Sequence, residues 1–124
     1  RPIQLPYGWD VKLPERAGYR SADAAETLRA RLERHDETAW MDFDVVGWTA
    51  ESRAMGEIYA YRYADGREVR TGDDLGQDYF DHAWGAAELQ LMRAAVRLAY
   101  LIDAAADGSL PRNLVRLTPA VAEP

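Results

Sequence analysis

The longest regular pattern in this sequence runs from about Gln77 to Asp107. Large apolar residues and alanines recur there at alternating steps of four and three, the spacing that gathers side chains on one face of an α-helix. The recurring positions are Phe80, Trp84, Ala87, Leu91, Ala94, Leu98, Leu101 and Ala105. Gly108 is expected to stop this helix and Pro111 to prevent its resumption. We therefore predict one long, core-facing helix near the C-terminus, against which the rest of the chain must pack.

A second helix is predicted in SADAAETLRARLERH, residues 21–35. Ser21 is a suitable N-cap, and acidic residues come early and arginines late, as the helix dipole favours. The expected buried stripe of this helix is Ala25, Leu28 and Leu32.

A third helix is predicted in TAESRAMGEIYAY, residues 49–61, with Thr49 as its cap. Its expected inward face consists of Ala50, Ala54, Ile58 and Tyr61. The following Asp65-Gly66 pair is a turn signal that either closes a short hairpin or only marks the end of the helix.

The N-terminal segment, residues 1–20, is rich in residues that oppose helix formation. These are Pro2, Pro6 and Pro14 together with Gly8 and Gly18. We expect this segment to be extended and to wrap over a helical body formed by residues 21–108, followed by a weakly patterned tail, residues 109–124. Hydrophobic residues make up 48% of the chain and charged ones 29%, which is ordinary for a globular protein. The predicted fold class is all-α, a single helical domain with one long C-terminal helix.

The charge of the chain limits its contacts with nucleic acid. The formal net charge is −6, so the surface as a whole does not supply the positive field that drives binding to phosphate backbones. Any contact with a phosphodiester would need a local source of positive charge, and bound cations are the usual source. Trp40, Trp48 and Trp84 could stack on bases, but packing inside the domain fits their positions better. No apolar run reaches the roughly 18–20 residues that cross a bilayer, so no membrane span is expected.

Local catalytic and metal-binding motifs are not found. The two histidines, His35 and His82, lack the one-turn spacing of a zinc-protease helix. DFDVVG begins like a calcium loop, but Arg53 stands at the twelfth position, where a carboxylate is required. The chain has no Cys and therefore no thiolate ligand. These observations indicate an acidic, mostly helical domain without a self-sufficient catalytic set, and no catalytic residue is predicted.

The long helix also carries a specific resemblance. ELQLMRAAVRLAYLID, residues 88–103, resembles the C-terminal signature of the zinc-dependent single-strand-specific nucleases (S-one/P-one type), distant kin of bacterial zinc phospholipase C. That signature is Glu-Leu-Gln followed by Ala-Gly-x-Arg-Leu-Ala-x-x-Leu-Asn. The matching residues are Glu88, Leu89, Gln90, Arg97, Leu98 and Ala99, whereas Ala95, Ile102 and Asp103 differ.

Two other segments resemble the same family in the same order. GWTAESRAMG, residues 47–56, is similar to a family helix that opens with Trp-Ala-x-x-Ser, and TGDDLGQDYFDHA, residues 71–83, is similar to the stretch before the closing helix. The resemblance runs from about Gln4 to Ala106 and corresponds only to the C-terminal half of a family member.

The stretch QLPYGWD, residues 4–10, resembles the family's last metal-binding motif, Asn-Leu-His-x-x-Trp-Asp, in which His and Asp bind zinc. Trp9 and Asp10 match, so the resemblance implies that Asp10 is a zinc ligand. Pro6 stands in the His position and has no side-chain donor atom. The family's other ligands lie upstream and have no counterparts here. Because one carboxylate cannot hold a zinc ion, we expect the isolated chain to bind zinc weakly or not at all.

Two hypotheses follow. In the first, the chain is the C-terminal part of a metal-dependent phosphodiesterase or nuclease for single-stranded nucleic acid or 3′-nucleotides, inactive without the missing N-terminal half. A second polypeptide or the rest of a longer one would supply the other ligands, and zinc would activate water for attack on phosphorus. Glu88, Arg93 and Arg97 are then expected to be scaffold. The resemblance also implies a secreted or periplasmic protein, because family members are typically exported.

In the second hypothesis, the chain is a noncatalytic helical domain that binds other proteins. Pro6 and the missing ligands motivate it. The apolar positions Leu89, Met92 and Val96 help to discriminate, because a partner is not required there if they pack inside the same chain. An unpaired apolar face would instead indicate a subunit interface.

Overall fold

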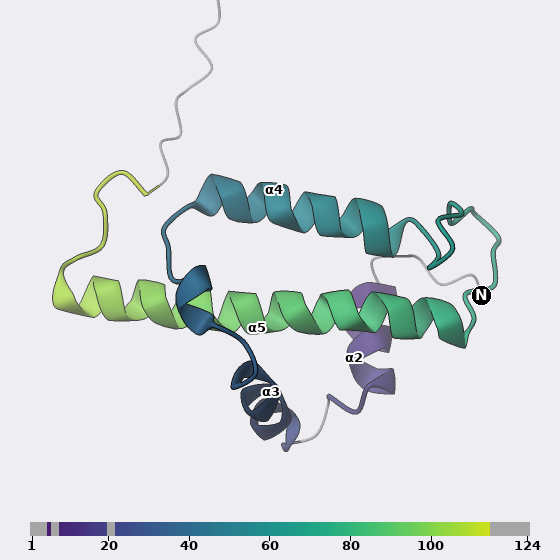
Figure 1. Cartoon of the computed structure of the whole chain (residues 1–124), viewed down its shortest axis with the longest axis horizontal. Coiled ribbons are helices and arrows are strands. Elements are labelled where there is room, and N and C mark those ends of the chain that lie inside the picture. Colours follow the sequence, from purple (N-terminus) through teal and green to yellow (C-terminus); the bar gives the residue numbers. More distant parts are fainter. Residues whose placement is uncertain (1–4, 6–7, 20–21, 115–124) are drawn as a thin grey trace, which may run out of the picture.

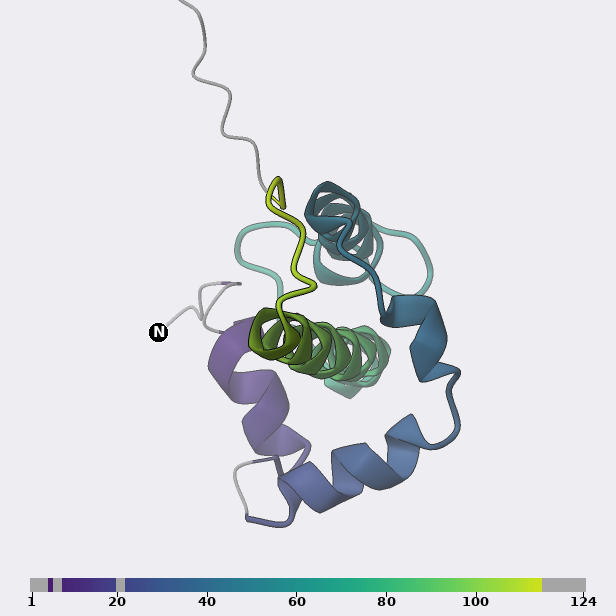
Figure 2. The same cartoon turned by 90° about the vertical axis from the view of Figure 1, so that its left-hand side faces the viewer.

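The computed structural model describes residues 5, 8–19 and 22–114, and its centre is the helix α5 (Gln77–Asp107). The other elements lie around α5, with α4 along one side and α2 and α3 across others (Figures 1 and 2). In chain order these elements are the π-helical turn η1 (Gly8–Lys12), α2 (Leu13–Arg16), α3 (Ala24–Leu32), the 3-10 turn η2 (Glu37–Trp40), α4 (Val45–Met55) and the π-helical turn η3 (Gly56–Ala60). The described ranges contain no strand beyond one isolated bridge, which confirms the all-α prediction.

The long C-terminal helix is confirmed with the predicted ends. Gly108 follows it with a φ of 78°, in the left-handed region that glycine adopts without steric cost. The backbone N–H of Leu110 then donates to the carbonyl of Ala104 over 3.1 Å, which turns the chain back at the helix end. Within the described ranges, no helix combines the length and the apolar character that crossing a bilayer requires.

The buried face of α5 is offset from the predicted stripe. The buried residues are Tyr79, Ala83, Ala86, Glu88, Met92, Val96 and Ala104. Of the predicted stripe, Phe80, Trp84, Ala87 and Leu101 are half-buried, whereas Leu91, Ala94, Leu98 and Ala105 are exposed. The prediction of a continuously core-facing stripe is therefore wrong. The helix has two apolar faces, and periodicity does not reveal which of them the rest of the chain covers.

The core cluster lies at the start of α5 and consists of Leu13, Tyr79 and Ala83. The Tyr79 hydroxyl donates to the carbonyl of Ala60 over 2.8 Å and accepts from the indole N–H of Trp9 over 3.0 Å. One buried phenol thereby joins η1 and η3 to α5.

The N-terminal segment is helical where extended backbone was predicted. Residues 8–16 form η1 and α2, so that prediction is wrong for this part of residues 1–20. Pro14 lies in the first turn of α2, where its missing N–H has no intrahelical partner to lose. Burial of Leu13, which is 1% exposed, gives the short helix a tertiary anchor. Pro2 and Pro6 lie outside the described residues.

The helix α3 is shorter and less buried than predicted. It begins at Ala24, after Asp23, whose side chain makes no capping hydrogen bond, and the predicted cap Ser21 lies outside the described residues. Of the expected buried stripe, Leu28 and Leu32 are half-buried and Ala25 is exposed. No residue of α3 is buried, so that stripe is wrong as a core face.

The helix α4 begins earlier than predicted. The carboxylate of Asp44 accepts from the backbone N–H of Gly47 over 2.9 Å and caps the helix, whereas the Thr49 hydroxyl donates to the carbonyl of Val45 inside it. Thr49 is therefore not the cap. The expected inward face is also wrong, because all four of its members are exposed: Ala50, Ala54, Ile58 and Tyr61.

The turn after η3 is a minimal hairpin. The N–H of Tyr63 donates to the carbonyl of Arg67 over 2.9 Å, and one antiparallel bridge joins Arg62 and Glu68. Gly66 has a φ of 87°, which explains why the Asp65-Gly66 pair turns the chain there. The helix had already ended, so of the two alternatives the hairpin is the one that forms. Residues 115–124 of the predicted tail lie outside the described residues.

Candidate functional site

Asp10 lies in η1 and is exposed. In the described part of the chain its carboxylate makes no hydrogen bond or ion pair, whereas the neighbouring Trp9 is half-buried and points to Tyr79. The short turn therefore directs the indole toward the interior and leaves the neighbouring carboxylate exposed, without a partner among the described residues.

Asp10 and Trp9 form part of the wall of an open groove of about 790 Å³. The helices α4 and α5 supply most of the other walls. Its apolar lining includes Trp48, Met55, Trp84, Leu91, Leu98 and Leu101, and its polar lining is Asp10, Ser52, Gln90 and Arg97. The groove thus leaves open part of the stripe of α5 that was predicted to be core, and Asp10, Trp48 and Trp84 all belong to its lining.

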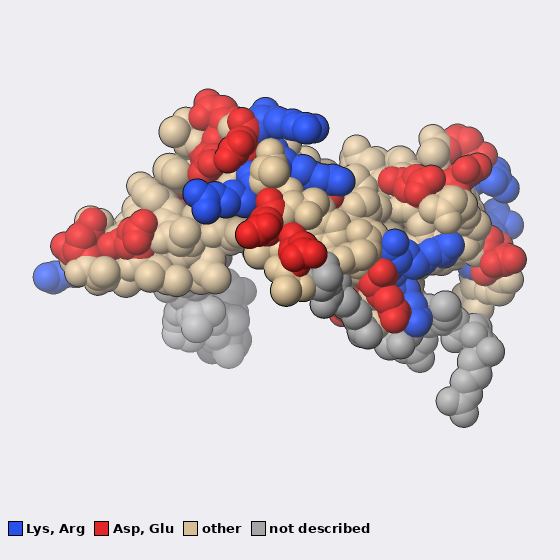
Figure 3. Space-filling view, turned by 90° about the horizontal axis from the view of Figure 1, so that it is seen from below, with Lys and Arg blue, Asp and Glu red and all other residues tan. Residues whose placement is uncertain are grey.

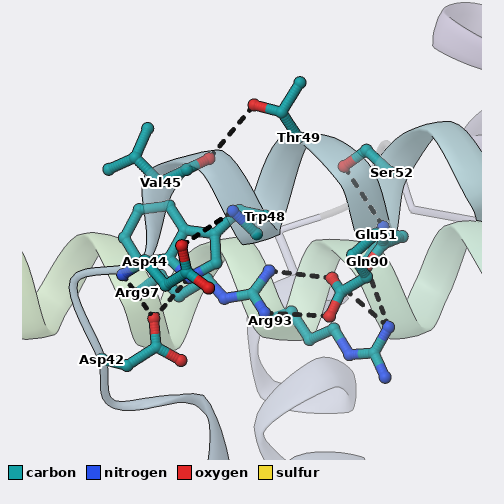
Figure 4. Close-up of polar contacts among 11 residues, drawn as sticks. Asp42, Asp44, Val45, Trp48, Thr49, Glu51, Ser52, Gln90, Arg93 and Arg97 are labelled. Carbon is teal, nitrogen blue, oxygen red and sulfur yellow. Dashed lines mark hydrogen bonds and ion pairs between the residues drawn. The ribbon is translucent and has the colours of Figure 1, made fainter. Parts of the chain in front are cut away.

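The helix α4 reaches α5 through long, paired side chains (Figure 4). The guanidinium of Arg97 donates to both carboxylate oxygens of Glu51, over 2.9 and 3.0 Å, and lies 5.1 Å from the ring centre of Trp48. Arg93 forms a longer ion pair with Glu51, at 3.4 Å. The hydrogen bonds from Arg97, joined by the charge of Arg93, lower the pKa of the Glu51 carboxyl although burial opposes this. Both cations are therefore paired within the scaffold, although the one carboxylate balances only one of the two positive charges.

A second carboxylate, Glu88, connects α5 to α3 and to the turn before it. Glu88 is only 9% exposed, accepts from the Tyr19 hydroxyl over 2.7 Å and forms an ion pair with Arg31. Burial acts to raise the pKa of Glu88, but the hydrogen bonds from Arg31 and Tyr19 prevail and lower it. Glu88 therefore joins α5 to α3 and to the turn at Tyr19, and its carboxylate is not free to act as a general acid or base.

The residues present do not fit a zinc site. In the described ranges no three His, Asp or Glu side chains come together in a way that could hold a metal ion, whereas zinc in proteins is held by three or four ligands. His35 and His82 pack against the rings of Trp40 and Tyr59, at 5.4 and 4.8 Å between centroids. Asp10 is therefore a single potential ligand, and Pro6 lies outside the described residues.

Sequence reasoning missed Glu51 and the groove itself. The signal for Glu51 was the pair Arg93 and Arg97, two cations one turn apart on α5, which require an acidic partner when they are buried. The signal for the groove was the presence of apolar residues on both faces of α5. Nothing in the spacing shows which face stays open.

Comparison with known proteins identifies the family. The S1/P1 nuclease family matches residues 4–107, which is most of the chain. Neither the curated proteins nor the solved structures provide a significant match. The match includes Asp10, both walls of the groove and the whole of α5. This chain therefore belongs to the S1/P1 nuclease family.

Proposed function

We propose that this chain is the C-terminal part of a zinc-dependent phosphodiester hydrolase that acts on single-stranded nucleic acid or 3′-nucleotides. One observation carries the proposal: the family match spans residues 4–107 and includes Asp10, at the position of a zinc-binding Asp in the resembling motif. Membership of the S1/P1 nuclease family supports a nuclease-like function in general. S1/P1 nucleases are also zinc-dependent in general. The substrate class and the role of Asp10 are the proposed refinements.

The geometry supports a metal site in which this chain supplies one ligand, Asp10, and the other ligands come from elsewhere. Asp10 is exposed and has no partner among the residues that the structure describes, as a ligand to an ion held mostly from elsewhere would be. Arg93 and Arg97 are paired with Glu51 and do not offer a free positive site for phosphate. On the face shown in Figure 3, acidic and basic side chains are interspersed. Positive charge for a phosphodiester would therefore come from metal ions.

The complete assembly requires a polypeptide that carries the remaining ligands. Without it this chain is inactive, because its own donor set does not fit zinc. A secreted or periplasmic location, typical of the family, is part of the same proposal.

The test combines an activity assay with an inventory of polypeptides. The purified chain is incubated with zinc and a fluorescent single-stranded DNA, and the material isolated from its native source is examined by intact-mass and peptide analysis. The proposal predicts no zinc-stimulated cleavage by the chain alone, zinc-stimulated cleavage by the native material, and a companion polypeptide or a longer chain in it. If the native material contains only this chain and does not cleave, the proposal fails.

A second function, a noncatalytic protein-interaction domain, is favoured by the exposed apolar residues Leu91 and Leu98, which line the groove. Met92 and Val96 are 4% and 6% exposed, so the face of α5 that they occupy requires no partner. Leu89 is half-buried. The native material would then contain a partner but would not cleave DNA with any amount of zinc.

A further inference from the structure

We propose that α3 opens from α5 as a separate unit while the rest of the chain stays folded, and that the ion pair between Arg31 and Glu88 holds it closed. This motion goes beyond the function proposed above, because it requires no zinc and no second polypeptide. It is a conformational change built into the fold, and it depends on contacts that the described residues make with one another.

The helix α3 contacts the rest of the molecule through one narrow edge. No residue of α3 is buried, and its half-buried residues are Ala24, Leu28 and Leu32. Their spacing of four places them on one side of the helix, and the other residues of α3 are exposed. Figures 1 and 2 both show α3 at the periphery, on the side of α5 opposite α4. Apolar burial therefore contributes little to holding this helix in place.

The buried group at this contact belongs to α5. Glu88 is 9% exposed, and its Oε2 atom accepts hydrogen bonds from Arg31, in the last turn of α3, and from the Tyr19 hydroxyl. Arg31 lies three positions after Leu28 and so reaches Glu88 from the same edge of the helix. Removing the charged partner of a buried carboxylate is strongly destabilising, so this ion pair favours the closed position of α3.

Away from α5, α3 is too short to stay helical. It has nine residues, fewer than the roughly 12–15 that an isolated helix needs in water. The residue before it, Asp23, makes no side-chain capping hydrogen bond that would support the first turn. Opening therefore exposes the backbone N–H groups of α3 to solvent, and their hydrogen exchange reports the opening.

Both ends of α3 lead to segments that are fixed independently of it. Before α3, the N–H of Tyr19 donates to the carbonyl of Pro14 over 2.8 Å, and the Tyr19 ring lies 4.7 Å from the ring of Trp84 on α5. After α3, the Trp40 ring centre in η2 lies 5.8 Å from the guanidinium carbon of Arg93 on α5. The helix can therefore open without displacing α2 or η2.

Hydrogen–deuterium exchange of the whole chain, resolved by NMR, tests whether α3 opens separately. The N–H groups of α3 are compared with those of Met92 and Val96 on the closed face of α5, after correction for intrinsic exchange rates. We expect the α3 groups to exchange at least about tenfold faster. Equal rates for the two sets would mean that α3 opens only when the whole chain unfolds, and would overturn the inference.

Arg31→Gln and Arg29→Gln form a matched pair of variants. Each removes one arginine from α3, but Arg29 lies two positions from Arg31, on a different side of the helix, and is exposed. Arg31→Gln should speed exchange in α3 by about fivefold or more. Arg29→Gln should change it by less than about twofold. Circular dichroism checks that both variants remain folded, as expected for an arginine whose side chain is 46% exposed in the first case.

The position of Tyr19 shows whether the opening is confined to α3. Its N–H should exchange at the same rate in Arg31→Gln as in the unmodified chain, because its contacts with Pro14 and Trp84 do not involve Arg31. If Arg31→Gln speeds exchange at Tyr19 as much as in α3, the two segments open together and α3 is not a separate unit. Equal acceleration of α3 by Arg31→Gln and Arg29→Gln would also overturn the inference.

Glu88→Gln tests the same ion pair from α5. It keeps an oxygen that can accept from Tyr19 but removes the charge that pairs with Arg31. If this pair holds α3 closed, adding Arg31→Gln to Glu88→Gln should speed exchange in α3 by less than about twofold more. Fully additive effects would show that Arg31 acts independently of Glu88 and would contradict the assigned role of the pair. Since none of these measurements involves zinc or cleavage, their failure would leave the proposed function untouched.

Discussion

The two apolar faces of α5 are similar in composition but differ in what covers them. The closed face buries Met92 and Val96, and the first turn of the helix buries Tyr79 against Trp9 and Ala60; the N-terminal turns, α3 and η2 pack against α5. The other presents Leu91 and Leu98 to an open groove whose far wall, α4, is connected to α5 by paired charges. The difference shows that this chain has a core of its own and, beside it, a second apolar surface that the described residues leave open.

The largest expected effect comes from the closed face. Tyr79→Ala removes a side chain that is 2% exposed and two hydrogen bonds, and we expect it to lower the free energy of unfolding by about 3–5 kcal/mol. Urea denaturation measures this loss. Tyr79→Phe, which keeps the ring, should cost only about 1–3 kcal/mol. Equal losses for the two variants would show that the ring contributes no packing and would contradict this description of the core.

The next effect comes from the polar link between α4 and α5. Arg97→Ala leaves Glu51 without its two best hydrogen bonds and should lower the unfolding free energy by about 1.5–3 kcal/mol. A double-mutant cycle with Glu51→Gln measures the coupling, which we expect at about 1 kcal/mol or more. Arg53→Ala is the control, because its pair with Glu57 is mostly exposed and should contribute less than about 1 kcal/mol. Additive effects of Arg97→Ala and Glu51→Gln would mean that the link does not hold α4 in place.

A smaller effect should appear in acid. The pKa values of Glu51 and Glu88 are lowered in the folded chain from an ordinary value of 4.5, so the unfolded state takes up protons first as the pH falls. The stability that these carboxylates contribute is complete above about pH 4.5 and is lost as the pH falls through their folded pKa values. Glu51→Gln should therefore flatten the decline of stability below that pH. If the unfolding free energy declines with falling pH as steeply in Glu51→Gln and in Glu88→Gln as in the unmodified chain, these carboxyls do not have lowered pKa values in the folded state.

The smallest effect belongs to the open face. Leu98→Ala should change the unfolding free energy by no more than about 0.5 kcal/mol, because the side chain is 58% exposed in the isolated chain. Ile102→Ala, with the same exposure, should behave alike. Thermal denaturation of the two variants measures this. A loss of several kcal/mol for Leu98→Ala alone would show that the groove is closed in solution and would remove the contrast between the faces.

The sequence predicted the long helix and its ends because the local signals there agree. Uninterrupted periodicity, Gly108 and Pro111 all point to the same boundaries. The N-cap of α4 was harder to predict from the sequence. Asp44 and Thr49 are both good capping residues, and only the tertiary position of α4 decides between them. The helical N-terminal segment was missed because anchoring of Leu13 in the core outweighs the local preference of a Pro-rich stretch.

The site was predictable only in part. Asp10 could be singled out by resemblance, and the structure adds that it borders the groove. The face of α5 that stays open could not be predicted, because periodicity reports that a helix is amphipathic and not what lies against it. Glu51 could not be paired with Arg97 from the sequence, since the two lie 46 positions apart along the chain, with the whole hairpin between them.

The zinc content of the purified chain tests the central claim, that this family member holds only one edge of a metal site. After dialysis against zinc and then against metal-free buffer, elemental analysis by mass spectrometry should find well below one zinc per chain, with no difference between the unmodified chain and Asp10→Asn. One or more tightly held zinc ions per chain, lost in Asp10→Asn, would contradict the account.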